Sequence, residues 1–258
     1  MTLAGDRFGR VLVLVAHPDD ETIACSGLLQ RATEALVVLA VDGAPPRYGF
    51  EKRFGSLQTY SDMRFREASR ALEFIPCCSL RRLVGPNEIP FVDQHLFLDL
   101  PAAFTCLVQI ARAFAPDLIV SHAFEGGHID HDACHVLAQR AAYALGTQCL
   151  EFPVYWKSEY GKDIFQQFRQ SRQDEVVLHL SQRELLIKRR MLAEYRSQVN
   201  VTSVFHTELE RFRPISKGPL TNVAWHKYPF ENRYRQLKTK VFLERVAEFQ
   251  QSALAVTA

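Results

Sequence analysis

The sequence predicts an α/β protein with a Rossmann-like, mostly parallel sheet covered by helices on both faces. Three observations support this fold class. Short Val- and Leu-rich runs, such as residues 11–15, alternate with longer stretches whose apolar residues recur at helical spacing. The short runs are apolar throughout, which is typical of strands that are buried on both faces. Polar residues directly follow two of the runs, and ligands bind at the carboxyl ends of strands in open α/β sheets.

The first 145 residues contain four alternations of strand and helix. The expected strands are residues 11–15, 35–41, 79–84 and 117–121, and the expected helices are residues 21–33, 60–74, 101–114 and 131–145. Residues 44–58 contain Pro45, Pro46, Gly49 and Gly55 and predict a long loop. Because this loop follows the end of a strand, we expect it to border the ligand site.

The remainder of the chain has weaker patterns. Residues 148–156 and 175–180 are typical of strands, and residues 181–195 of a helix in which Ser181 and Glu184 form a capping box. Residues 196–232 are rich in Pro, Gly and aromatic side chains and are expected to fold over the site, before a final amphipathic helix at 233–250. No linker clearly divides the sequence, so we expect one domain over residues 1–258.

Composition excludes several classes of function. The 258 residues are 47% hydrophobic and 23% charged, with a net charge of +2 and no basic tract that would bind nucleic acid. We expect no transmembrane segment, and the N-terminus lacks the apolar core of a signal peptide. The six cysteines contain no Cys-x-x-Cys pair, which favours reduced thiols in a cytoplasmic protein. The sequence does not fix the oligomeric state, and a homo-oligomer is compatible with it.

The most informative segments follow the first and fourth predicted strands. Residues 16–21 read Ala-His-Pro-Asp-Asp-Glu, and residues 126–131 read Gly-Gly-His-Ile-Asp-His before a helix. Ionisable groups are costly to bury at strand ends unless a metal or a reaction uses them. Histidine nitrogens and aspartate oxygens suit Zn²⁺, with Fe²⁺, Co²⁺ and Mn²⁺ as competitors. The sequence therefore predicts a divalent metal site where the two strand ends meet.

Together, the two motifs resemble the LmbE-like, or PIG-L, family of metal-dependent deacetylases, which remove the acetyl group from N-acetylglucosamine units. The resemblance covers about residues 9–145 and implies an LmbE-like fold, with residues 146–258 as a C-terminal elaboration. It implies that His17, Asp20 and His131 bind the metal and that Asp19 is the general base. It also implies that His128 stabilises the tetrahedral oxyanion and that the substrate is a small N-acetylated sugar conjugate.

The chemistry of these residue types agrees with the implied roles. Successive residues that leave a strand point in different directions, so Asp19 and Asp20 can serve different purposes. Bound Zn²⁺ lowers the pKa of its water to about 7, so a neighbouring carboxylate can take the proton. Glu21 and Asp130 are candidates for carboxylates that orient a ligand imidazole.

The resemblance also implies residues that bind the sugar hydroxyls. Family members use an Arg that precedes the helix after the second strand, together with an Asp. Arg53 and Arg64 are the candidates for the Arg, and Asp93 and Asp99 are the candidates for the Asp. Surface salt bridges are the alternative for all four residues.

Several of these residues have a second interpretation. The first motif could instead be a charged helix N-cap. His135, four residues after His131, could share its helix face and ligate the metal, although the family does not use that position. His122 could line the pocket or cap its strand. Tyr155 and Trp156 could stack on a sugar ring or pack in the core or a lid.

Two other functions fit the same motifs. The first is an amidase that acts on a different amide, such as a thiol conjugate or a natural product. The second is a non-catalytic, metal-containing binding protein. The presence of Asp19 argues against the second, because a structural metal site needs its ligands but not a base.

Overall fold

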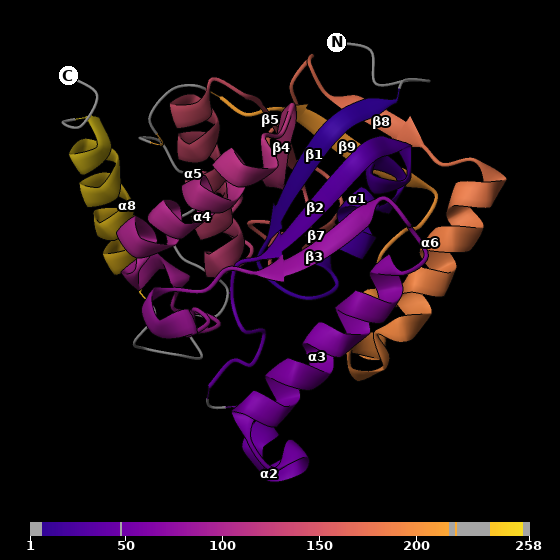
Figure 1. Ribbon diagram of the computed structural model, residues 1–258, viewed down its shortest axis with the longest axis horizontal. Helices are drawn as coiled ribbons and strands as arrows, with labels where there is room; N and C mark the ends of the chain where they lie inside the picture. Colours follow the sequence, from indigo (N-terminus) through magenta and orange to yellow (C-terminus); the bar gives the residue numbers. More distant parts are fainter. Residues whose placement is uncertain (1–6, 47, 217–219, 221–237, 255–258) are drawn as a thin grey trace.

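Seven strands form the central sheet in a computed structural model, which describes residues 7–46, 48–216, 220 and 238–254 (Figure 1). They are β1 (Phe8–Val15), β2 (Ala32–Leu39), β3 (Cys78–Arg82), β4 (Leu118–His122), β5 (Gln148–Phe152), β8 (Val176–His179) and β9 (Leu209–Pro214). The order across the sheet is β3-β2-β1-β4-β5-β9-β8. The strands from β3 to β5 pair in parallel, whereas β9 and β8 are antiparallel.

Helices cover both faces of the sheet (Figure 1). On one face lie α1 (Asp20–Arg31), α3 (Leu57–Leu72) and α6 (Gln182–Glu194), and on the other α4 (Leu100–Phe114), α5 (Ile129–Leu145) and α8 (Thr239–Leu254). The side chains of β1 alternate between the two cores: Val13 packs on the first face, and Leu12 and Leu14 pack on the second. This arrangement confirms the predicted mostly parallel sheet with two helical layers.

The strand order places β1 at the point where the direction of the chain across the sheet reverses. From β1 the chain proceeds to β2 and β3 on one side, and it then returns to β4 and β5 on the other. β1 and β4 are therefore hydrogen-bonded neighbours, with Leu14 opposite Ser121. The carboxyl ends of strands at such a switch point are where open α/β sheets bind ligands.

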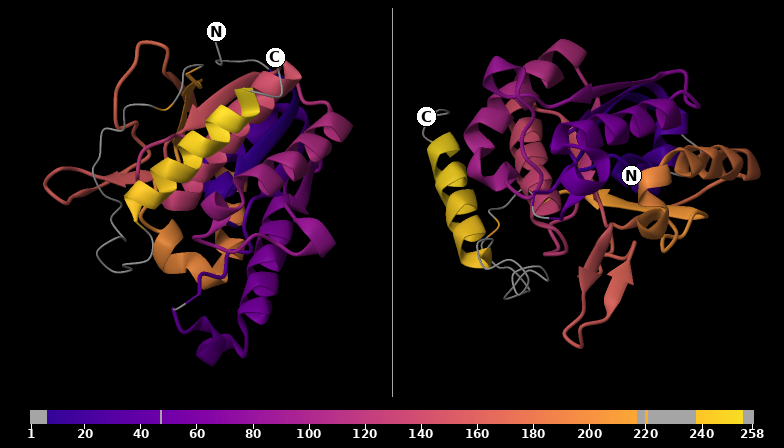
Figure 2. Two further views of the ribbon diagram at one scale, coloured as in Figure 1. Left: turned by 90° about the vertical axis from the view of Figure 1, so that its left-hand side faces the viewer. Right: turned by 90° about the horizontal axis from the view of Figure 1, so that it is seen from below.

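Two predicted elements differ from the structure. The strand expected over residues 148–156 divides at Pro153, which has no backbone N–H to continue a ladder. Its second part, β6 (Tyr155–Lys157), pairs instead with β7 (Asp163–Phe165), and this hairpin projects from the body of the protein (Figure 2). The sequence analysis found neither β7 nor β9.

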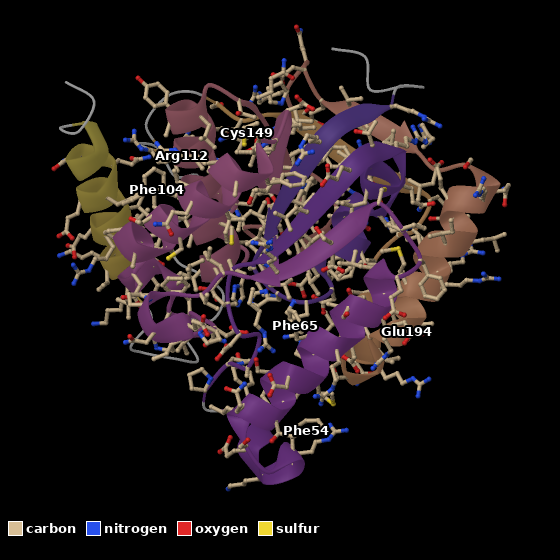
Figure 3. The ribbon with its side chains drawn as sticks, viewed as in Figure 1. Phe54, Phe65, Phe104, Arg112, Cys149 and Glu194 are labelled. Carbon is tan, nitrogen blue, oxygen red and sulfur yellow. The ribbon has the colours of Figure 1, made fainter. Side chains whose placement is uncertain are left out.

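The expected loop over residues 44–58 contains a short helix, α2 (Phe50–Phe54), at the foot of α3. Stacked aromatic rings hold it there: the rings of Phe50 and Phe54 (Figure 3) lie 4.3 and 4.7 Å from the ring of Tyr60. α3 also begins earlier than expected, because the hydroxyl of Ser56 accepts a hydrogen bond from the backbone N–H of Thr59.

The C-terminal part follows the predictions in outline. The helix expected at 181–195 is α6, and Ser181 and Glu184 form the predicted capping box. Residues 196–216 contain the 3-10 turn η3 (Arg196–Gln198), α7 (Val199–Thr202) and β9. Residues 217–219 and 221–237 lie outside the described part, so the expected folding of this segment over the site stays a prediction there. Two further 3-10 turns, η1 (Pro86–Glu88) and η2 (Leu96–Leu98), precede α4.

None of the helices in the described ranges is long and apolar enough to cross a lipid bilayer. All six cysteines are free thiols.

A buried ion pair attaches the C-terminal strands to α1. Glu210 of β9 accepts hydrogen bonds from the backbone N–H groups of Gly27 and Leu28, at 2.9 and 3.2 Å from the nearest carboxylate oxygen of each. Lys188 of α6 donates to the same carboxylate at 2.8 Å, and both charged side chains are fully buried. Gly27 permits this approach, because a Cβ there would lie 3.1 Å from the Glu210 carboxylate.

We predict that Lys188→Met lowers the free energy of unfolding by about 3–5 kcal/mol, because it leaves the Glu210 carboxylate buried without its cation. The matched control is Lys240→Met on α8, since the side chain of Lys240 is 85% exposed in its pair with Glu244. The control should change stability by less than about 0.5 kcal/mol. Urea unfolding of both variants measures the difference. Equal, small changes would mean that the N–H groups of α1 satisfy Glu210 without the lysine.

Candidate active site

His17 and Asp20 lie between the carboxyl end of β1 and the start of α1. The backbone N–H of His17 donates to Asp20 Oδ2 at 2.9 Å, and His17 Nδ1 lies 3.3 Å from the same oxygen. Burial alone would raise the pKa of Asp20, but the imidazoles of His131 and His122 lower it well below its usual value. Asp20 is therefore ionised, with histidine nitrogens around it, and a carboxylate must be ionised to bind a metal.

The second motif forms the turn into α5. Gly126 has a left-handed backbone (φ 71°), and Gly127 lies so close to β6 that a Cβ would be 1.8 Å from the carbonyl oxygen of Tyr155. The buried carboxylate of Asp132 accepts hydrogen bonds from the backbone N–H groups of Glu125 and Gly126. The left-handed backbone and the close approach of β6 explain why glycine occupies both positions. The hydrogen bonds to Asp132 fix the turn that carries His128 and His131.

Asp20 Oδ2 joins the two motifs, because His131 Nε2 lies 3.4 Å from it. The rings of His17 and His131 are 5.3 Å apart. Among the described residues, donor atoms within 4.8 Å of one another form three groups: His17, His128 and His131; Asp20, His122 and His131; and His17, Asp93, His128 and Asp130. The three predicted ligands are thus divided between the first two groups, which share His131.

His122 and His135 are both placed less well than His131 to bind a metal through a ring nitrogen. His122 Nε2 accepts the backbone N–H of Ala16 at 3.0 Å, and its ring stacks on His131 at 4.0 Å. His135 Nδ1 lies 3.0 Å from the carbonyl oxygen of His122 and 3.1 Å from Glu151 Oε2, and it belongs to none of the three groups. The geometry therefore favours His131 over His135, the ligand that sequence analysis ranked second.

Two carboxylates face the other nitrogen of His17. Nε2 lies 3.5 Å from Asp93 Oδ1 and 3.6 Å from Asp130 Oδ2. Burial would lower the pKa of His17, but the charge of Asp93 and contacts with Asp130 and Asp20 raise it well above its usual value. Asp130 thus lies where a carboxylate that orients a ligand imidazole was predicted. Asp93, predicted to bind sugar, is buried against the same imidazole.

Asp19 has a strained backbone with a φ of 125°. For a residue other than glycine, such a conformation costs about 1–3 kcal/mol and persists only where neighbouring contacts impose it. Arg64 donates to the carbonyl oxygen of Pro18 at 2.7 Å and to Asp19 Oδ2 at 3.2 Å. Burial raises the pKa of Asp19 to about 8, although the charge of Arg64 opposes this shift.

Glu21 differs from its predicted role. Instead of facing a ligand imidazole, its Oε2 accepts the backbone N–H of Asp19 at 3.1 Å. Its Oε1 accepts hydrogen bonds from the hydroxyls of Thr22, at 2.6 Å, and of Tyr195. Glu21 therefore holds the backbone of Asp19, the residue that was predicted to be the base.

His128 is the N-cap of α5. Its Nδ1 accepts the backbone N–H of Asp130 at 3.2 Å, so the neutral imidazole carries its proton on Nε2. Burial lowers the pKa of His128 well below its usual value, and the charges of His17 and His131 lower it further. His128 is therefore a neutral N–H donor, which is the form that can stabilise an oxyanion.

The predicted substrate-binding residues separate into two groups. Arg64 is buried and donates to the carbonyl oxygens of Pro18 and Gly43, so it supports the protein around Asp19. Arg53 is exposed on α2, with its guanidinium 5.1 Å from the ring of Phe54, and Asp99 is exposed at the start of α4.

The two aromatic candidates have different surroundings. The ring of Tyr155 lies edge-on to His131, 5.4 Å away. Trp156 Nε1 donates to the carbonyl oxygen of Gln167 at 2.8 Å, and Arg169 covers its ring. Trp156 therefore packs within the β6–β7 region, whereas Tyr155 lies beside His131, one of the predicted ligands.

Sequence analysis missed two residues that shape the site, Asp132 and Tyr195. Acidic residues are common in the first turn of a helix, so the sequence could have indicated a structural role for Asp132 at the start of α5. Tyr195 carried no such local signal, because its partner Glu21 lies 174 residues earlier in the chain.

The fold and the site identify the class of protein first. A mostly parallel sheet with helices on both faces is the fold of LmbE-like deacetylases. The family described as PIG-L, GlcNAc-PI de-N-acetylase, matches residues 12–142, and the chain belongs to this family.

Known proteins resemble the chain to different extents. A Bacillus subtilis (strain 168) protein described as "Probable N-acetyl-alpha-D-glucosaminyl L-malate deacetylase 2" is 30% identical over 139 residues, which are 52% of this chain. The match spans only 60% of that relative's length.

Solved structures match over more of the chain. A deacetylase of the teicoplanin biosynthesis pathway is 18% identical and aligns with 82% of this chain and 100% of its own, with a TM-score of 0.61. N,N'-diacetylchitobiose deacetylase from Pyrococcus horikoshii is 13% identical and aligns with 82% of this chain and 87% of its own, with a TM-score of 0.54. A 4-carboxy-2-hydroxymuconate hydratase from Pseudomonas putida matches with a TM-score of 0.50, at 16% identity over 84% of this chain and 100% of its own. At these identities the structures show the shared fold alone.

The geometry predicts which histidine a bound metal requires. His131→Ala should lose the metal, because His131 belongs to two of the three donor groups. His135→Ala should retain it, because His135 Nδ1 faces a carbonyl oxygen and Glu151. Metal content of both purified variants, after incubation with Zn²⁺ or Fe²⁺ and removal of excess ion, provides the comparison. Retention in His131→Ala with loss in His135→Ala would reverse the assignment.

Proposed function

We propose that the protein is a metal-dependent hydrolase that removes the N-acetyl group from an N-acetylglucosamine-type sugar conjugate. The observation that carries this proposal is the meeting of His17, Asp20 and His131 between a buried carboxylate, Asp19, and a neutral imidazole, His128. Membership of the PIG-L family supports the same reaction.

The donor set fits a borderline divalent ion. His17 Nδ1 and His131 Nε2 lie 3.3 and 3.4 Å from Asp20 Oδ2. Two ligands of one Zn²⁺ ion, each bound at about 2.0–2.1 Å, lie about 3.3–3.4 Å apart, and these two spacings match that value. His17 and His131 would have to move closer together to share the ion with Asp20, because no group of described residues within 4.8 Å contains all three. Two nitrogens and one oxygen suit Zn²⁺ best, with Fe²⁺ as the competitor. When bound, the ion supplies Lewis acidity that activates water and polarises the amide carbonyl.

The residues around this site provide the proton transfers. Asp19 accepts the proton of the attacking water, and Arg64 holds its carboxylate in place. With a pKa raised to about 8 by burial, Asp19 can return that proton to the leaving amine near neutral pH. His128 donates its Nε2 proton in a hydrogen bond to the tetrahedral oxyanion, because its Nδ1 is engaged by the N-terminus of α5.

The B. subtilis relative suggests a soluble glycoside as the substrate, since its described substrate is a malate conjugate. An amidase for a thiol conjugate or a natural-product amide uses the same residues and is the second candidate. We disfavour a non-catalytic binding protein, because the strained and buried Asp19 has no purpose in a structural metal site. The free cysteines support a cytoplasmic location.

The first test is acetate release. Protein loaded with Zn²⁺ or Fe²⁺ should release acetate from at least one N-acetylglucosamine conjugate in a panel that includes the malate conjugate, and a chelator should abolish the release. Cleavage of larger amides without acetate release would favour the amidase. Metal binding without hydrolysis of any amide would favour the binding protein.

The second test concerns the base. Asp19→Asn should retain the metal, because Asp19 is not one of the proposed ligands, and should lower kcat by about 10²–10⁴-fold, the usual contribution of a general base. Paired measurements of metal content and kcat separate the two effects. Full activity would exclude Asp19 as the base, whereas loss of the metal would make Asp19 a ligand.

A further inference from the structure

A four-residue turn that is distant from both motifs in sequence contacts Glu21 and also the helix that carries Arg64. The turn comprises residues 195–198, between α6 and α7. Its first residue, Tyr195, is fully buried and donates a hydrogen bond from its hydroxyl to Glu21 Oε1. Glu21 Oε2 in turn accepts the backbone N–H of Asp19, at the position where the backbone is strained. Tyr195 thus reaches the base through one intervening carboxylate.

The other residues of the turn attach to α3. Ser197 donates its backbone N–H and its hydroxyl to the two carboxylate oxygens of Glu67, at 2.9 and 2.6 Å. Gln198 Nε2 donates to the hydroxyl of Tyr60 at 2.8 Å. Figure 3 shows Glu194, the residue before the turn, on α6 next to α3, where it pairs with Arg70.

These attachments lie on the face of α3 that carries Arg64. Tyr60, Arg64 and Glu67 occupy positions i, i+4 and i+7, so they share one side of the helix. The turn holds the first and third of these residues, while the second holds the Asp19 carboxylate and the carbonyl oxygen of Pro18. The backbone and the carboxylate of Asp19 are therefore both fixed by groups that the same turn supports.

We propose that the turn at residues 195–198 is a positioning element for the general base, with Tyr195 as its main residue. This inference rests on the proposed function for its effect on catalysis. Among the described residues, the Tyr195 hydroxyl contacts Glu21 Oε1 and, at 3.3 Å, Thr22 Oγ1, and neither atom belongs to the donor groups of the metal site. Tyr195 therefore acts on Asp19 through Glu21. The turn lies outside residues 12–142, the part of the chain that the family model matches. The proposal therefore gives the C-terminal part of the chain a role in catalysis.

The test removes one hydroxyl. Tyr195→Phe retains the buried ring but removes one of the two hydroxyl donors to Glu21 Oε1 and leaves the other, Thr22, in place. Tyr160→Phe is the control, because Tyr160 is 97% exposed at the end of the β6–β7 hairpin. Hydrogen exchange of peptides spanning residues 16–23 should become faster in Tyr195→Phe and should stay unchanged in Tyr160→Phe. Unchanged exchange in both variants would overturn the proposal, whether or not a substrate is known.

Measurements of kcat, KM and metal content distinguish a positioning role of Tyr195 from a general contribution to stability. Tyr195→Phe should lower kcat by about 10–100-fold, a typical effect of a small misplacement, without changing KM or metal content. In an Asp19→Asn background the same substitution should have no further effect, because the base that it positions is absent. A loss of equal size in both backgrounds would overturn the proposal.

Two other outcomes are distinguishable. If the unmodified protein hydrolyses nothing in the panel, the proposed function fails, and the exchange experiment still decides whether the turn holds Asp19. If Tyr195→Phe does not fold, Gln198→Met replaces it, since it removes the hydrogen bonds from Gln198 Nε2 to Tyr60 and to Ser197 Oγ and leaves Tyr195 unchanged. Gln198→Met should lower kcat less than tenfold, again without effect in the Asp19→Asn background. A loss that persists in that background would contradict the proposal.

Discussion

The structure depends most on the burial of several ionisable groups at the carboxyl end of β1. His17, Asp19, Asp20, Asp130 and His131 are all at least nine-tenths buried. Burying such groups is unfavourable unless each has a charged or hydrogen-bonding partner. Elements that are distant in sequence supply these partners: Arg64 comes from α3, the N–H groups around residue 94 from the segment before α4, and Tyr195 from the end of α6. The architecture around the sheet is therefore also the support of the site.

The part of the site that local sequence determines could be predicted. A buried strand followed by His-Pro-Asp-Asp-Glu, and a second strand followed by Gly-Gly-His-Ile-Asp-His, must meet when the strands are parallel neighbours. What could not be predicted depends on contacts between distant residues. Arg64 is 45 residues from Asp19. Asp93, whose carboxylate faces His17, donates its backbone N–H to Oδ1 of Asp42, 51 residues earlier. Periodicity carries no information about such pairs.

The C-terminal part is attached to α1 at several points, which include the ion pair of Arg31 with Glu184. Near its start, Tyr195 contacts Glu21, and near its end the Lys188–Glu210 pair holds the N–H groups of Gly27 and Leu28. Because α1 begins with Asp20, any shift of this helix would move a proposed ligand and the base next to it. The contacts of α6 and β9 thus explain why the sheet extends beyond the parallel strands that carry the two motifs.

Asp19 and Asp20 illustrate how the fold gives neighbouring, chemically identical side chains different properties. Both are buried, which raises the pKa of each. The imidazoles of His131 and His122 reverse this effect for Asp20, whose pKa falls well below its usual value. For Asp19, burial is the largest effect and the charge of Asp20 acts in the same direction, so the charges of Arg64 and His17 do not prevent its pKa from rising to about 8. Two carboxyl groups whose surroundings separate their pKa values in this way are suited to different tasks. The anion can hold a metal, and the group that titrates near neutrality can exchange a proton. The strained backbone at Asp19 is the conformation in which its carboxylate meets Arg64, while the carboxylate of Asp20 faces the histidines.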